Sequence, residues 1–299
     1  MDNIKGIIEK YNINFVEPLN KGWSKDKKYI LTDSSDSKYL LRVSSPSLYS
    51  KKKEQFELLK KMEDLDIYCS RAIEFGTLED GNVYILLSYL EGESAEDVLP
   101  HLSNEEAYLL GIEAGKVLQK LHNIPVKLTN TSWKEKYHEK MPRKIKALRE
   151  CKYKLPLEDF LIGYYENKSY LMDDRPLKFS HGDYHAGNMI VHNGKIGIID
   201  FDKNTIADPY DELKPFCWNV FKSEYFETGL INGYFNNDVP EDFFKILKYY
   251  SVESLISHLP WSVQFGEEDI QTSYRVYNAM LEWWGNFNLD IPTWYKGVL

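Results

Sequence analysis

Two short polar segments of the chain hold residues whose types and spacing suit chemistry. The first, residues 181–188, reads His-Gly-Asp-Tyr-His-Ala-Gly-Asn, and the second follows an apolar run and begins at Asp200. Phosphoryl transfer needs little covalent help, but it needs one carboxylate that orients a hydroxyl and accepts its proton, and oxygen ligands for Mg²⁺. Asp183, Asn188 and Asp200 supply such groups, so these segments predict phosphoryl transfer.

A β-hairpin is predicted between the two segments. Residues 189–191 and 196–199 are apolar, and the four residues between them contain an Asn193-Gly194 pair. Asn-Gly accommodates the positive φ angles of a tight hairpin turn. We therefore expect a hairpin that carries oxygen ligands at both of its ends.

The chain before residue 91 alternates between strands and polar turns. One helical pattern, with Phe56, Leu59 and Met62 on one face, interrupts the strands. The basic run 51–53 is interpreted as the solvated start of this helix. The expected strands are residues 13–19, 27–32, 38–43, 71–77 and 83–90.

From Ser103 onward the pattern becomes mainly helical, and a first helix there has its apolar residues on one face. A length of 299 residues suits two closely joined lobes. The prediction is an α+β chain in which residues 1–91 form a domain with five antiparallel strands and one helix. Residues 92–299 form a helical domain that also contains the hairpin.

Composition narrows the class of protein. Hydrophobic residues make up 43% of the chain, too many for a disordered protein, and no run of about 18 apolar residues predicts a membrane span. The first ten residues do not resemble a secretory signal, so we expect a cytoplasmic protein. A net charge of −9 disfavours nucleic acid as partner and favours cationic ligands. The cysteines, at positions 69, 151 and 217, are too far apart for a zinc site or a disulfide framework.

The two polar segments and the hairpin between them resemble the signature of the aminoglycoside phosphotransferase and choline kinase superfamily, in which HGDxHxxN precedes a strand ending in Ile-Asp. The sequence has no GxGxxG loop, so the aminoglycoside phosphotransferase branch is the more similar one. The resemblance implies a bilobed protein-kinase-like fold with Asp183 as catalytic base and with Asn188 and Asp200 as Mg²⁺ ligands. It also implies that His181 frames the loop, and we expect His181 and His185 to be packed, hydrogen-bonded residues.

The resemblance extends to nucleotide binding. It implies that the backbone at Ser88 and Leu90 binds the purine edge, and that Ser24, in the first turn, contacts phosphate. Family members also place a basic residue on the third strand, paired with a carboxylate on the following helix. That residue is usually lysine.

In this sequence the basic residue of the third strand is Arg42. Arginine binds phosphate through a planar fork rather than as a point charge, so the phosphate pose differs from that of a lysine. Its expected partner is Glu54, with Glu57, one turn further along the helix, as the alternative.

Two segments after the hairpin bear on the acceptor. Only residues 201–207 separate Asp200 from Asp208-Pro209, which is too short a stretch for the peptide-docking segment of a protein kinase. Asp208 and the acids that follow resemble the family's D-P-x-x-[DE] segment and are expected at a helix start.

The second segment is acidic and follows an aromatic stretch. Glu267, Glu268 and Asp269 lie near where the family places its acceptor pocket, and they would suit a polycation. The alternative is that this run is only the solvated start of a helix.

The leading hypothesis is a monomeric phosphotransferase that uses Mg²⁺ and ATP or GTP to phosphorylate a hydroxyl of a small cationic molecule, with an aminoglycoside antibiotic first and resistance as the implied role. Choline-like amino alcohols, macrolides and sugars are the close alternatives. The rival of another class is a weakly active, nucleotide-binding pseudokinase, which the arginine at position 42 suggests. Neither nucleic acid nor a membrane is an expected partner.

Overall fold

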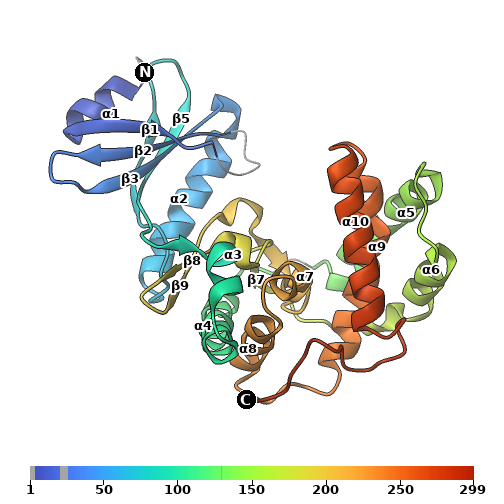
Figure 1. Ribbon diagram of the computed structural model, residues 1–299. Helices are drawn as coiled ribbons and strands as arrows, with labels where there is room; N and C mark the ends of the chain where they lie inside the picture. The colour runs from blue at the N-terminus through green and yellow to red at the C-terminus, as the bar shows by residue number, and fades with distance from the viewer. Residues whose placement is uncertain (1–3, 21–25, 129) are drawn as a thin grey trace. The chain divides into compact units, whose positions relative to one another are not determined.

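The structure, a computed structural model, describes residues 4–20, 26–128 and 130–299 (Figure 1). The chain forms two compact units, of which the first comprises residues 1–93 and 189–202 and the second residues 94–188 and 203–299. The first unit contains a five-stranded antiparallel sheet, and the second is mainly helical. The predicted α+β fold class is confirmed.

The sheet of the first unit has the strand order β1-β2-β3-β5-β4. Its strands are β1 (Ile13–Pro18), β2 (Lys27–Asp33), β3 (Lys38–Ser44), β4 (Ala72–Thr77) and β5 (Val83–Ser88). Leu31, Leu41 and Leu86 are completely buried in the core of this unit, which helix α1 (Lys5–Lys10) also covers. The five strands expected from the sequence are all present.

Helix α2 (Tyr49–Glu63), which follows the short helix η2 (Pro46–Leu48), packs against β4 and β5 (Figure 1). Phe56, Leu59 and Met62 are buried, as their helical spacing predicts, and the ring of Phe56 lies 5.8 Å from that of Phe75. The same buried face also includes Lys52. A lysine on this face is unexpected, because lysine is almost never fully buried unless it is paired.

The predicted hairpin is formed by β8 (Met189–His192) and β9 (Lys195–Ile198), with Asn193 and Gly194 at φ angles of 50° and 73°. The sequence prediction assigned it to the C-terminal domain, whereas its contacts group it with the first unit. The Ile198 amide donates a 2.9 Å hydrogen bond to the Tyr68 carbonyl, and a Cβ at Gly197 would lie 2.8 Å from Leu90. The two-residue strand β6 (Glu93–Ser94), which precedes the hairpin in the chain, lies at the boundary of the units.

The second unit consists of helices with one small sheet, formed by β7 (Lys178–Ser180) and β10 (Thr205–Ala207). Its helices are α3 (Ala95–Val98), α4 (Asn104–His122), α5 (Trp133–Glu150), α6 (Glu158–Asn167), α7 (Phe216–Val220), α8 (Glu224–Phe235), α9 (Phe243–Ser262) and α10 (Glu267–Trp283). Short 3₁₀ helices are η3 (Leu99–His101), η4 (Ser169–Met172), η5 (Ala186–Asn188), η6 (Phe201–Lys203) and η7 (Asp211–Leu213). Within the described ranges, no helix is both long enough and apolar enough to cross a membrane.

Helices α4 and α8 lie side by side at an unusually close distance (Figure 1). A Cβ at Gly111 would lie 2.1 Å from the Phe226 carbonyl oxygen, and one at Gly233 would lie 2.3 Å from the Ile112 carbonyl oxygen. A capping box between Ser103 and Glu106 fixes where α4 begins. This close pair forms the support on which the loop after β7 rests.

Candidate functional site

The loop between β7 and η5 brings two of the predicted residues together. The Asn188 side-chain amide donates hydrogen bonds to Asp183, at 2.9 Å to the backbone oxygen and 3.1 Å to Oδ2. Because the amide nitrogen is engaged in this way, the Asn188 Oδ1 oxygen is directed away from Asp183. The D-x-x-x-x-N spacing therefore produces a carboxylate and an amide that orient each other within one loop.

Two basic side chains accompany Asp183. Lys203 Nζ lies 2.8 Å from Asp183 Oδ2, and His185 Nε2 lies 3.6 Å from Oδ1. Burial raises the pKa of Asp183, but His185 and Lys203 outweigh burial and hold the pKa below the ordinary value of an aspartate. Asp183 is therefore ionised at neutral pH and can only accept hydrogen bonds.

Lys203 was missed by the sequence analysis, although one signal was available. Gly182 has a φ of +83°, and a Cβ at this position would lie 2.2 Å from the Lys203 backbone oxygen. Only glycine permits both the left-handed conformation and the close approach. The glycine of the His-Gly-Asp motif thus places residue 203 beside residue 183.

Buried polar groups hold the loop in place. Tyr184 donates a 2.6 Å hydrogen bond to the Ala114 carbonyl of α4, and the Gly182 amide donates at 2.9 Å to Glu212. The Ala186 amide donates at 2.7 Å to Asn219 Oδ1. His181 is fully buried and packs edge-on against the Tyr184 ring, which fits the framing role that the resemblance implied.

The Asp-Pro segment is part of this support rather than a set of exposed acids. Asp208 is fully buried and accepts hydrogen bonds from Arg175 at 2.7 and 2.9 Å and from the Tyr250 hydroxyl at 2.5 Å. Glu212 is 3% exposed and also accepts a hydrogen bond from Ser180. Both acids anchor the start of η7, and neither is placed to bind a ligand in solvent.

The other predicted site residues lie in the first unit, where Arg42 is the centre of an acidic cluster. Its Nε and Nη2 atoms donate to Asp26 Oδ2 at 3.0 and 2.7 Å, and Nη2 also donates to Asp202 Oδ2 at 2.5 Å. Nη1 lies 3.9 Å from Asp200 Oδ1. Burial lowers the pKa of Arg42, but the charges of Asp202 and Asp26 raise it further, so the guanidinium stays charged.

The expected partners of Arg42 on the helix were wrong. Glu54 and Glu57 are exposed, because the buried face of α2 carries residues 52, 55, 56, 59 and 62. The helix contributes Lys52 to the cluster instead, with Nζ 2.6 Å from Asp26 Oδ2 and 3.4 Å from Asp202 Oδ1. Arg42 is thus held by carboxylates from outside the helix.

Asp200 is suited to bind a cation. It has a φ of +65°, and its Oδ1 atom is buried without a hydrogen-bond partner among the residues that the structure describes. Arg42 Nη1, at 3.9 Å, is beyond hydrogen-bond distance of this oxygen, and a buried carboxylate oxygen is stabilised by a closer positive partner. Asn188 belongs to the other unit, and the described residues contain no cluster of three or more histidine, cysteine or acidic side chains that could bind a metal by itself. Oxygen groups of the Asp200 and Asn188 type are those that Mg²⁺ prefers.

The predicted hinge follows β5. The Ser88 amide donates to the Arg71 carbonyl at 2.9 Å, and Ser88 Oγ accepts from the Arg71 amide at 2.8 Å. Leu90 is buried, and in the described part of the chain its backbone makes no hydrogen bond. The Leu90 backbone is therefore the better candidate for a purine contact. Ser24 lies outside the described residues.

The predicted acceptor residues open helix α10, as the alternative interpretation expected. Glu267 and Glu268 are exposed, and Gln271 donates a 2.7 Å hydrogen bond to Glu267. Trp261, at the end of α9, and Phe265, in the turn that follows, are 49% and 41% exposed, with ring centroids 4.6 Å apart. Acids and exposed aromatic rings thus gather where α9 ends and α10 begins, a combination that suits a cationic and partly apolar ligand.

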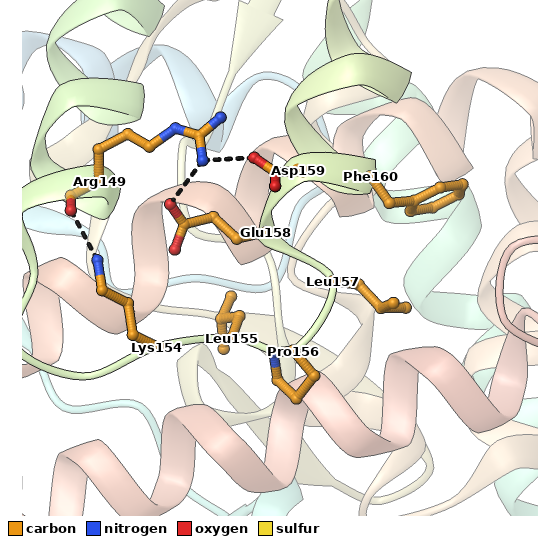
Figure 2. Close-up of a pocket in the computed structure, with 8 residues that line it drawn as sticks. All are labelled: Arg149, Lys154, Leu155, Pro156, Leu157, Glu158, Asp159 and Phe160. Atoms are coloured by element: carbon orange, nitrogen blue, oxygen red, sulfur yellow. Dashed lines mark hydrogen bonds and ion pairs between the residues drawn. The ribbon is translucent and has the colours of Figure 1, made fainter.

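The pocket in Figure 2 lies elsewhere in the second unit and contains none of the predicted site residues. It is an open depression of about 440 Å³ lined by Arg149 and residues 154–160. Its two basic and two acidic side chains balance in charge: Arg149 pairs with Glu158 at 3.2 Å and with Asp159 at 2.5 Å, and Lys154 donates a hydrogen bond to the Arg149 backbone oxygen (Figure 2). Nothing in this arrangement indicates a ligand.

Comparison with known proteins agrees with the geometry. Residues 16–241 match the model of the phosphotransferase enzyme family. A search of curated protein sequences found no significant match. The chain is similar in fold to the GDP complex of aminoglycoside 2'-phosphotransferase-IIIa, with a TM-score of 0.74, 15% identity, and coverage of 93% of this chain and 96% of that one.

Two further solved structures show the same fold. The gentamicin complex of APH(2")-IIa has a TM-score of 0.65 and 18% identity over 92% of this chain and 94% of that one. Aminoglycoside phosphotransferase APH(2'')-Ib with bound ADP has a TM-score of 0.66 and 16% identity over 93% and 98% of the two chains. At such identities the likeness establishes the protein-kinase-like fold of this group.

Proposed function

The chain belongs to the phosphotransferase enzyme family, and from this premise we propose that it transfers the γ-phosphate of ATP or GTP to a hydroxyl of a small cationic acceptor, with an aminoglycoside as first candidate. The observation that carries the proposal is the Asp183–Asn188 pair, which is joined by two hydrogen bonds at the spacing that kinases use. Solved structures of similar fold contain GDP, ADP, ATP and aminoglycosides.

Asp183 is the proposed base. Because Lys203 and His185 keep its carboxylate ionised, it is ready to accept a hydrogen bond from the acceptor hydroxyl and later its proton. The transition state of phosphoryl transfer is loose, so orienting the hydroxyl matters more than a strongly basic group. A carboxylate with a lowered pKa is adequate for this task.

Asp200 and Asn188 are the proposed ligands of Mg²⁺. The buried Oδ1 atom of Asp200 and the oriented amide of Asn188 fit a hard cation, each within its own unit. When bound, the ion would neutralise charge on the phosphates. Arg42, the backbone near Leu90 and Ser24 complete the proposed nucleotide contacts.

A phosphotransfer screen tests the proposal. Mg-ATP and Mg-GTP are each combined with aminoglycosides, amino alcohols, macrolides and neutral sugars, and a chelator replaces Mg²⁺ in the control. We expect a phosphorylated cationic product only when Mg²⁺ is present. Tight nucleotide binding without transfer to any acceptor would favour the pseudokinase. The proposal also includes that the protein acts as a monomer in the cytoplasm.

The acceptor residues have a separate test. Replacing Glu267 and Glu268 by glutamine removes two charges and keeps size, so the KM of a cationic acceptor should rise while the nucleotide KM stays constant. The effect should shrink with added salt, because exposed charges are screened over about 8 Å at physiological ionic strength. Glu105→Gln, which removes an exposed acid from the first turn of α4, is the matched control. If the acceptor KM were the same in wild type, in the double glutamine variant and in the control, residues 267–269 would serve only as the start of α10.

A further inference from the structure

Lys52 is the most unusual charged residue of the first unit. Its side chain is only 4% exposed, although residues 51 and 53 on either side are exposed. The sequence suggested that residues 51–53 form a solvated helix start, but Lys52 is buried. It lies in the same ion cluster as Arg42.

A single carboxylate oxygen holds the two cations. Asp26 Oδ2 accepts from Lys52 Nζ at 2.6 Å and from Arg42 Nη2 at 2.7 Å and Nε at 3.0 Å. Ser44 donates to the other oxygen, Oδ1, at 2.7 Å. The Asp26 side chain is itself 4% exposed, so its position is fixed from all of these sides.

The cluster becomes more open towards Asp200. The side chains of Asp26, Lys52 and Arg42 are 4–7% exposed, that of Asp202 is 21% exposed and that of Asp200 is 41% exposed. Arg42 spans this gradient, because its Nε and Nη2 atoms contact Asp26 while Nη1 lies towards Asp200. The buried side of the guanidinium is thus fixed, and the opposite side remains directed to the proposed metal ligand.

We propose that Asp26 and Lys52 are positioning residues of the nucleotide site, and that Asp26 replaces the helix carboxylate that was expected to hold Arg42. In this chain helix α2 contributes a positive charge, Lys52, to the cluster, and the carboxylate comes from Asp26, the residue before β2. Lys52 balances the second carboxylate, Asp202, so that Arg42 is held by two acids without an excess of buried negative charge. This inference rests on the proposed function.

Such an arrangement explains the arginine at position 42. A lysine ammonium would compete with Lys52 for Asp26 as a second point charge, whereas the planar guanidinium binds Asp26 along one edge and places Nη1 towards Asp200. The position of that nitrogen depends on Asp26. Removing the negative charge of Asp26 should therefore disturb phosphate binding and leave contacts to the nucleoside unchanged.

Equilibrium binding tests this directly. The probes are the Mg²⁺ complexes of the imido analogues of ATP and GTP, together with adenosine and guanosine, measured by calorimetry on the full chain. For Asp26→Asn and Lys52→Met we expect the Kd of the bound triphosphate analogue to rise at least tenfold, while the nucleoside Kd changes less than twofold. Lys53→Met, an exposed lysine of the same helix, and Glu54→Gln should leave both constants unchanged.

A relocated charge separates positioning from simple loss of stability. Adding Lys52→Glu to Asp26→Asn places a carboxylate on the helix, next to Arg42, and should recover at least part of the triphosphate affinity that Asp26→Asn loses. Lys52→Glu alone should be worse than Lys52→Met, because it adds negative charge beside Asp26 and Asp202. Melting temperatures are measured in parallel, and binding is compared well below the lowest of them.

The outcomes are distinct. Triphosphate affinity that is unchanged in Asp26→Asn and Lys52→Met would overturn this inference and leave the proposed function intact. Impaired binding in Glu54→Gln with normal binding in Asp26→Asn would restore the helix carboxylate as partner of Arg42. A wild-type chain that binds no triphosphate would overturn the proposed function and, with it, this inference.

Discussion

Glu227, in helix α8, is a buried acid that has no positively charged partner in the part of the chain that the structure describes. It is 1% exposed and accepts a 2.7 Å hydrogen bond from Asn219, whose Oδ1 atom in turn accepts a hydrogen bond from the Ala186 amide of the loop that carries Asp183. Burial raises the pKa of Glu227 to about 8, and the hydrogen bond from Asn219 offsets only part of that effect. We expect Glu227 to be protonated in the folded protein at neutral pH and Glu227→Gln to reproduce that state.

The sign and size of the effect follow from linkage. The unfolded chain ionises Glu227 near its ordinary pKa of 4.5, whereas the folded chain holds the proton until about pH 8, so folding loses stability as the pH rises between these values. At about 1.4 kcal/mol per pH unit, the loss between pH 5.5 and 7.5 is about 2 to 3 kcal/mol. Glutamine cannot ionise, so the variant does not lose this stability.

Denaturant unfolding of wild type and Glu227→Gln at several pH values provides the measurement. The variant should gain about 2 to 3 kcal/mol over wild type between pH 5.5 and 7.5. Other titrating groups cancel in this difference, and the exposed Glu241→Gln serves as control. A difference between wild type and variant that does not change across this range would refute a protonated Glu227.

The remaining predictions concern Asp183 and the lysine beside it. Asp183→Asn should lower kcat by at least about 100-fold while the nucleotide Kd stays nearly unchanged, because general-base catalysis contributes roughly that factor; near-normal turnover would remove Asp183 from this role. Lys203→Met should lower kcat roughly five- to tenfold, since an exposed charge-assisted hydrogen bond is lost, and Lys203→Arg should retain most of the activity. Equal turnover in both lysine variants and wild type, in steady-state kinetics, would show that the Lys203–Asp183 pair is incidental.

Local patterns predicted the fold and the contact between Asp183 and Asn188 well, because their signals lie within short stretches. The Asn193-Gly194 turn, the apolar strands and the Asp183–Asn188 spacing each depend on residues close in sequence, and the structure contains all three. The predicted domain division at residue 91 differs from the structure, because the first unit also contains residues 189–202. The hairpin joins the first unit through contacts with Tyr68, which no local pattern reveals.

The ion cluster could not be predicted in the same way. Asp26, Arg42 and Asp202 are joined across up to 176 positions of sequence, and each alone resembles an ordinary surface charge. One signal was nevertheless present: Lys52 lies four residues before Phe56 and seven before Leu59, the spacing of one helix face. The resemblance to family members pointed instead to Glu54, which is two residues away from that face.

The pKa of Asp183 is lowered and that of Glu227 is raised, and this difference explains why Asp183 is the acid suited to accept a proton from a hydroxyl. Burial raises the pKa of both acids, but interactions with Lys203 and His185 reverse the effect at Asp183, whereas Asn219 offsets only part of it at Glu227. A protonated carboxyl cannot accept a proton from a hydroxyl, so Glu227 is unsuited to act as a base near pH 7 despite its position behind the same loop. Charge partners rather than burial therefore determine which acid can take part in the reaction, and Glu227, through Asn219, serves to hold the loop that carries Asp183.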